Sequence, residues 1–194
     1  MLNVDARGAF GSAVEPRHDA APSPSVKAKP LGSERPAMQA PPATPGFAVP
    51  LRFLVGIAAA VAATLAMDAV MNRRPEGATP PTVAAGVLTD RHPDLAPERL
   101  ATVVHYLAGG LSGGLYVWLL YATEATLDTT GGLATVVAAV VMLALMIGFF
   151  AVVVLPRSRI QRGRRSAVRR DWTAAAATYV VVLAPLVALG TEIV

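Results

Sequence analysis

Asp68 and His105 are the two side chains in this sequence best suited to chemistry. Both lie within long apolar segments, Asp68 about one turn before the first ends and His105 about one turn after the second begins. An ionised carboxylate at the centre of a membrane helix costs roughly 2.5–3.5 kcal/mol and less near the interface, and a histidine partner reduces this cost. Because such a pair can exchange a proton near neutral pH, a proton or cation site is the functional hypothesis for these residues. The preferred interpretation is structural: Asp68 reaches the headgroups or caps the next loop, and His105 bonds a neighbouring helix.

A semi-polar stripe continues from His105 along the same segment. Ser112 and Tyr116 follow it by seven and eleven residues, which places all three on one face of a helix. Hydroxyl and imidazole groups in an apolar helix seek partners, so this face is expected to point into a bundle. Thr178 and Tyr179 of the last apolar segment are the candidate partners.

A glycine-rich run occupies residues 109–114 in the same segment. It contains two overlapping pairs of glycines four residues apart, a pattern that lets another helix backbone approach closely. The first apolar segment offers a matching strip of small residues, so we expect the two segments to pack together within one chain. Homodimerisation, or a pore or ligand contact, are the alternatives. The predicted packing positions are Gly56, Ala60, Gly109, Gly110, Gly113 and Gly114.

Recognisable catalytic motifs are absent from the sequence. There is no cysteine, no glycine loop followed by Lys-Ser/Thr, no HExxH and no GxSxG. Asp90, His92 and Asp94 alternate like metal ligands, but a site needs a further ligand and Pro93 restricts the backbone. A hydrated, charged turn is the preferred interpretation, and neither a metal nor a cofactor is expected.

The elements that position these side chains are predicted to be membrane helices. Of 194 residues, 54% are hydrophobic and only 15% are charged, whereas a soluble domain carries about 25% charged residues. The mean hydropathy is +0.49. Apolar residues form four blocks, each long enough to cross a bilayer. We therefore predict an all-α integral membrane protein, a bundle of four transmembrane helices in two hairpins, with spans at about 52–71, 100–122, 132–155 and 172–194.

The segments outside the spans have different compositions. Residues 1–50 are rich in Pro, Ala and Ser, which predicts a disordered tail, and either Met1 or Met38 is the start. In the loop 72–99, residues 80–88 are expected to form a short helix, with Asp94 a candidate cap for the next span. This loop is expected either to lie on the membrane surface or to be a solvated connector.

Basic residues predict the orientation. The net charge is +4. Arginines are concentrated in the loops 72–99 and 156–171, whereas the charged residues of the loop between the second and third spans are all acidic. The positive-inside rule then places both basic loops in the cytoplasm and both termini outside a plasma membrane. The basic loop is expected to contact anionic lipid headgroups rather than nucleic acid. Its arginines are Arg157, Arg159, Arg162, Arg164, Arg165, Arg169 and Arg170.

Packing features outnumber chemical ones in this sequence. It therefore favours a non-enzymatic accessory or partner-binding subunit, with a membrane-protein partner or a homo-oligomer as the assembly. The alternative is a small proton- or cation-linked transport protein that uses Asp68, His105 and the Ser112/Tyr116 face; a membrane-bound enzyme ranks third. The glycine-rich second span and the segment 66–71 resemble those of small prokaryotic membrane proteins, a likeness that assigns no residue a role.

Overall fold

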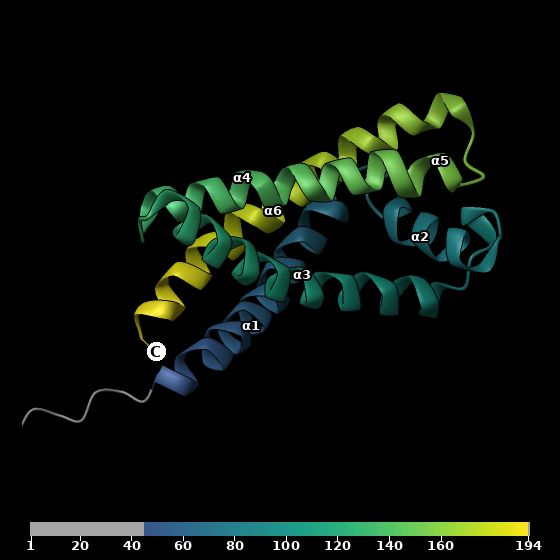
Figure 1. Cartoon of the computed structure of the whole chain (residues 1–194). Coiled ribbons are helices and arrows are strands. Elements are labelled where there is room, and N and C mark those ends of the chain that lie inside the picture. Colours follow the sequence, from purple (N-terminus) through teal and green to yellow (C-terminus); the bar gives the residue numbers. More distant parts are fainter. Residues whose placement is uncertain (1–44, 194) are drawn as a thin grey trace, which may run out of the picture. The chain divides into compact units, whose positions relative to one another are not determined.

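The computed structural model describes residues 45–193, and the regular structure in this part is helical throughout (Figure 1). Four helical stretches are long and apolar enough to cross a membrane: Ala48–Met71, Glu98–Leu127, Gly132–Arg157 and Arg162–Glu192. The prediction of an all-helical chain with four long apolar helices is therefore confirmed. The main helices are α1 (Pro45–Met71), α2 (Thr79–Thr89), α3 (Glu98–Leu127), α4 (Gly132–Phe149) and α6 (Arg165–Glu192).

Two helices begin before the segments predicted to cross the membrane. The tail was predicted to reach residue 50, and α1 begins at Pro45; residues 1–44 of the tail lie outside the described residues. The fourth span was predicted from about residue 172, and α6 begins at Arg165, so the predicted loop 156–171 is partly helix. Arginine is a good helix former and residues 165–171 contain no Gly or Pro, so the helix extends beyond the apolar block.

The third long helix changes geometry near its end. After α4, the chain forms a π-helical turn, η2 (Phe150–Val154), and then the short α5 (Leu155–Arg157). The Leu155 N–H donates to the Phe150 carbonyl oxygen, five residues earlier. Pro156 has no N–H and its ring crowds the carbonyl four residues before it, so a widened turn relieves the clash.

The long helices pack in a ring. α1 lies against α3 and α6, and α4 also lies against α3 and α6. Small residues of α1, including Ala60 and Ala63, are fully buried in the same hydrophobic cluster as Tyr116 and Tyr179. This combination of small and aromatic side chains lets α1 sit close to its neighbours. The chain runs back and forth along the ring, so the loops 72–97 and 158–164 meet at one end (Figure 1).

The first basic loop contains the predicted short helix. α2 has Pro80 and Pro81 in its first turn, where a proline's missing N–H costs no helical hydrogen bond. The expected cap was wrong. Asp94 lies in the 3₁₀ turn η1 (Pro93–Leu95), and Pro97 occupies the N-cap position of α3. Pro97 has the extended backbone that the N-cap position needs. It has no side-chain acceptor, so α3 begins without a side-chain cap.

Candidate functional site

Asp68 and His105 are in direct contact. The His105 Nε2 and Asp68 Oδ1 atoms lie 2.7 Å apart, and the Tyr106 hydroxyl donates to Asp68 Oδ2 at 2.7 Å. The Asp68 side chain is 24% exposed and that of His105 is 11% exposed. Each of the two carboxylate oxygens therefore lies within hydrogen-bonding distance of a different side chain of α3.

Tyr106 was missed in the sequence because it lies outside the predicted polar stripe. It follows His105 directly, so a helix turns the two side chains about 100° apart. Asp68 reaches both because it comes from α1, which crosses this turn of α3, and because a carboxylate has two oxygens to offer. The sequence signal that could have identified Tyr106 is its position directly after His105.

Close packing of α1 and α3 sets the distance between the pair. Gly113 has no side chain, and a Cβ there would overlap the Gly56 carbonyl oxygen and lie 2.5 Å from the Ala60 Cβ. A Cβ at Gly109 would overlap the Thr64 hydroxyl oxygen. These four small residues of the predicted packing set therefore lie at the α1–α3 contact.

The second glycine pair lies less tightly against α1. A Cβ at Gly114 would be in ordinary van der Waals contact with the Phe53 ring of α1, at 3.9 Å, but one at Gly110 would have no neighbour within 4 Å. The prediction that Gly110 packs against α1 was therefore wrong. One residue along a helix rotates a side chain by about 100°, which turns Gly110 away from the close contact made by Gly109.

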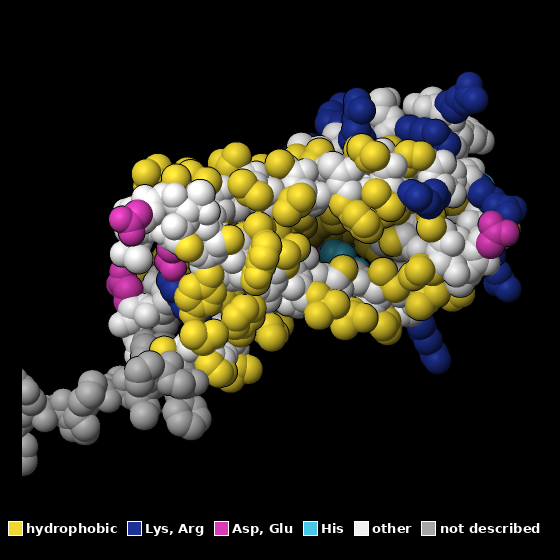
Figure 2. Space-filling view, in the orientation of Figure 1, with side chains coloured by type: hydrophobic (Ala, Val, Ile, Leu, Met, Phe, Trp, Pro, Cys, Tyr) yellow, Lys and Arg dark blue, Asp and Glu magenta, His cyan; other side chains and the backbone are white. Residues whose placement is uncertain are grey.

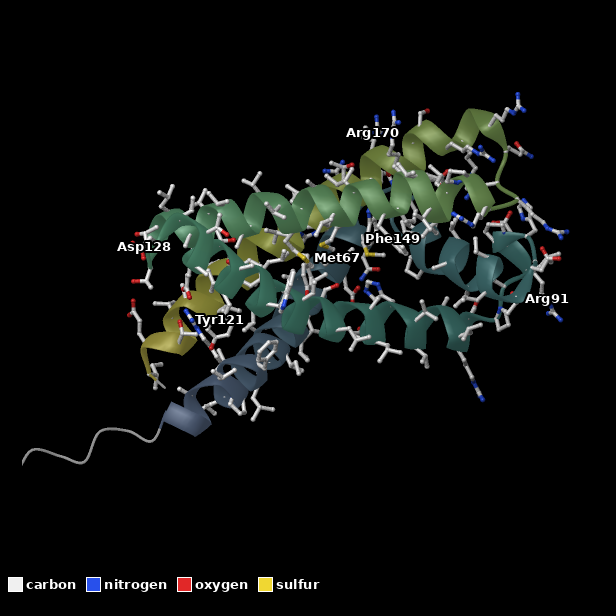
Figure 3. The ribbon with its side chains drawn as sticks, viewed as in Figure 1. Met67, Arg91, Tyr121, Asp128, Phe149 and Arg170 are labelled. Atoms are coloured by element: carbon white, nitrogen blue, oxygen red, sulfur yellow. The ribbon has the colours of Figure 1, made fainter. Side chains whose placement is uncertain are left out.

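A cavity of about 250 Å³ adjoins the pair. His105 forms part of its wall, and most of the remaining lining is apolar, including Met67 of α1 and Phe149 of α4 (Figure 3). The space-filling view shows a hollow surrounded by hydrophobic side chains (Figure 2). His105 thus contacts Asp68 and also borders a largely apolar cavity.

The other predicted site residues divide between two places. Ser112 lines the cavity, but Tyr116 is buried in the core and its hydroxyl donates to a backbone carbonyl of α4 at 3.3 Å. The structure therefore does not bring Tyr116 to the pair, because the eleven residues from His105 to Tyr116 span about 16 Å along a helix. Tyr179 donates to the Gly109 carbonyl oxygen at 2.7 Å and also lines the cavity, whereas Thr178 bonds within its own helix.

Ion pairs unforeseen in the sequence tie the two basic loops together. Arg164 donates two hydrogen bonds of 2.8 Å to the Glu76 carboxylate, and these bonds lower the pKa of Glu76 from its ordinary value. The Asp171 side chain is fully buried, accepts a 3.1 Å hydrogen bond from the Glu76 N–H and lies 3.6 Å from the Arg74 guanidinium. The sequence contained a signal for this contact, because Asp171 is the only acidic residue among the arginines of residues 156–171.

The opposite end of the bundle has its own ion pair. Arg52 of α1 donates two hydrogen bonds, of 2.8 and 3.0 Å, to the Glu124 carboxylate of α3. The same guanidinium lies 4.7 Å from the centre of the Tyr121 ring. Together with the Asp68 contact, this pair fixes α1 against α3 near both ends.

The alternating carboxylates of residues 90–94 are not directed at one point. Asp90 pairs with Arg159 at 2.7 Å, and Asp94 lies 3.6 Å from Arg164. His92 accepts a 3.4 Å hydrogen bond from the Asp94 N–H. Within residues 45–193, no group of three or more His, Asp or Glu side chains is arranged to hold a metal ion.

Comparison with protein-family models, curated proteins and solved structures finds no match to this chain. The contacts within the chain are therefore the basis for inferring its function.

Proposed function

We propose that this chain is an integral membrane protein of the cell membrane, with the loops 72–99 and 156–171 in the cytoplasm and both termini outside. In support, arginines gather at the end of the bundle where these two loops meet, and acidic side chains such as Asp128 lie at the other end (Figures 2 and 3). The positive-inside rule assigns the basic end to the cytoplasm. Labelling an Asp128→Cys variant, but not Asn72→Cys, from outside intact cells would support this orientation; the reverse pattern would exclude it.

We further propose that the protein is a small proton-linked transport protein, in which protonation of the Asp68–His105 pair is coupled to an apolar ligand in the adjacent cavity. The observation that carries this proposal is that His105 both contacts a carboxylate 2.7 Å away and lines a cavity of about 250 Å³. A proton gained by the pair therefore changes the charge and hydrogen bonding of a side chain in the cavity wall.

The proposed mechanism assigns the proton to one atom of the histidine ring. His105 Nε2–H donates to the Asp68 carboxylate, 2.7 Å away, and the added proton binds at Nδ1. The pair then changes from a net negative charge to a neutral imidazolium–carboxylate pair. At the same time, Nδ1 changes from an acceptor to a donor.

The site favours a proton over a metal cation. Both Asp68 oxygens are already engaged, one by His105 and one by Tyr106. Metal cations need several oxygen or nitrogen ligands, and the other cavity-lining side chains are mostly apolar. Imidazole itself ordinarily titrates between pH 5 and 8, which suits a physiological proton gradient.

A probe in the cavity tests the coupling without knowledge of the ligand. The sequence has no cysteine, so a Ser112→Cys variant can be labelled with bimane at the cavity wall. We expect the bimane emission to change between pH 5 and 8, and this change to disappear when Asp68→Asn or His105→Gln is added. Gly110→Cys, which lies on an open face of the same helix, is the matched control and should not respond. A response that persists in Asp68→Asn and His105→Gln would exclude the coupling.

The partner-binding subunit favoured by the sequence remains a second candidate. The observation that supports it is Gly110, whose missing side chain leaves space that no described residue fills, beside the exposed Leu107 and Leu111. A helix of a second membrane protein, or of a second copy, fits such a position. The mass of the intact complex after pull-down in mild detergent tests this: wild type should retain a stoichiometric partner that Gly110→Leu loses.

A further inference from the structure

The arginines of residues 157–170 fall into two groups. Three are paired with a carboxylate, and a fourth, Arg157, donates a short hydrogen bond of 2.7 Å to a backbone carbonyl. The other three have no carboxylate oxygen within 4.0 Å among the described residues. The engaged arginines are Arg157, Arg159, Arg164 and Arg170, and the others are Arg162, Arg165 and Arg169.

These three arginines surround one hollow, of about 330 Å³. They are spaced three and four residues apart, which places them on one face where the chain enters α6. The Ser166 hydroxyl also lines the hollow, and the wall formed by Leu155 and its neighbours at the end of the third long helix is apolar. The hollow therefore combines concentrated positive charge with an apolar side.

The guanidinium of Arg165 has a buried N–H group without an acceptor among residues 45–193. Its guanidinium makes one long hydrogen bond, of 3.5 Å, to the Ser158 carbonyl oxygen. Its Nε atom is buried and has no partner in the described part of the chain. A buried guanidinium N–H without an acceptor is costly, and the planar donor set of arginine matches the oxygens of a phosphate.

We propose that this hollow, lined by Arg162, Arg165, Ser166 and Arg169, binds the phosphate of an anionic phospholipid. The inference rests on the membrane insertion proposed above. A free phosphate would bring the same oxygens, but the apolar wall favours a lipid, whose glycerol and acyl carbons would lie against Leu155. The hollow also lies where the apolar helix ends and the arginines begin, which is the depth of the cytoplasmic headgroups in the proposed orientation.

The test compares two triple variants that lose the same charge from the same end of the molecule. The first is Arg162→Gln/Arg165→Gln/Arg169→Gln; the matched control changes Arg73, Arg91 and Arg99, which are exposed and have no ion pair among the described residues. Native mass spectrometry measures the binding of phosphatidylglycerol, and of phosphatidylcholine with the same acyl chains, to purified protein in detergent. We expect the first variant to lose affinity for phosphatidylglycerol by on the order of 100-fold, and the control far less.

Each alternative result has a distinct meaning. Equal losses in both variants would overturn the site, because the attraction would then be a general field of positive charge. Inorganic phosphate that displaces phosphatidylglycerol and stabilises the protein equally well would overturn the lipid as ligand. Extraction of wild-type protein from membranes by alkaline carbonate would instead contradict membrane insertion, a failure distinguishable from either.

Discussion

Gly113 is the position where the smallest substitution is expected to have a large effect. In Gly113→Ala, the new Cβ would overlap the Gly56 carbonyl oxygen and lie 2.5 Å from the Ala60 Cβ, whereas carbon atoms pack at about 3.5–4.0 Å. The obstacles are backbone and a Cβ, which cannot rotate away, so α1 and α3 must separate. Overpacking of this kind costs about 1–3 kcal/mol.

The matched control is Gly110→Ala, three residues earlier in the same helix. Both substitutions gain the same helix propensity, about 0.8–1.0 kcal/mol, so the difference between them isolates the clash. We expect Gly113→Ala to be less stable than Gly110→Ala by about 1–3 kcal/mol. Unfolding of the detergent-solubilised protein by SDS, followed through its two tryptophans, provides the measurement. Equal stability of the two variants would refute the close α1–α3 contact.

Three further predictions concern polar contacts. Because Arg164 lowers the pKa of Glu76 in the folded chain, the stability from this pair is present above the ordinary glutamate value of 4.5 and is lost as the pH falls through the lowered one. Glu76→Gln should therefore flatten the acid side of a plot of SDS unfolding midpoint against pH. Asp171→Ala should cost about 1–3 kcal/mol in the same assay, because the buried carboxylate is the acceptor for the Glu76 N–H; no loss would contradict this. Tyr106→Phe removes a donor from Asp68 and should change the bimane pH response, whereas Tyr116→Phe should leave it unchanged, since its hydroxyl bonds to α4.

The contact between Asp68 and His105 could be anticipated from the similar depth of the two residues. The two long helices are joined through one loop, so residues one turn from that loop on each helix lie at similar heights. The choice between the two glycine pairs could not be anticipated in the same way. Both pairs have the same spacing, and the sequence does not say which face of α3 is turned toward α1.

Two other differences have a common physical origin: a helix meets different neighbours along its length. The stripe from His105 to Tyr116 was interpreted as a single site. His105 contacts α1 and lines the cavity together with Ser112, whereas Tyr116 bonds to α4. Similarly, the start of α6 was placed where the apolar residues begin. Helical backbone continues through Arg165 because arginine favours helix, and the apolar block marks only the part of α6 that suits a membrane.

The place of α1 between α3 and α6 has a consequence for the order of synthesis. α1 is made first among the described helices, but its two neighbours follow it, one of them only after α3 and α4 are complete. Asp68 is synthesised 37 residues before His105, so its carboxylate is present in the growing chain before its histidine partner has been made. Because α6 touches both α1 and α4, a chain truncated within α6 loses support on two sides of the ring at once.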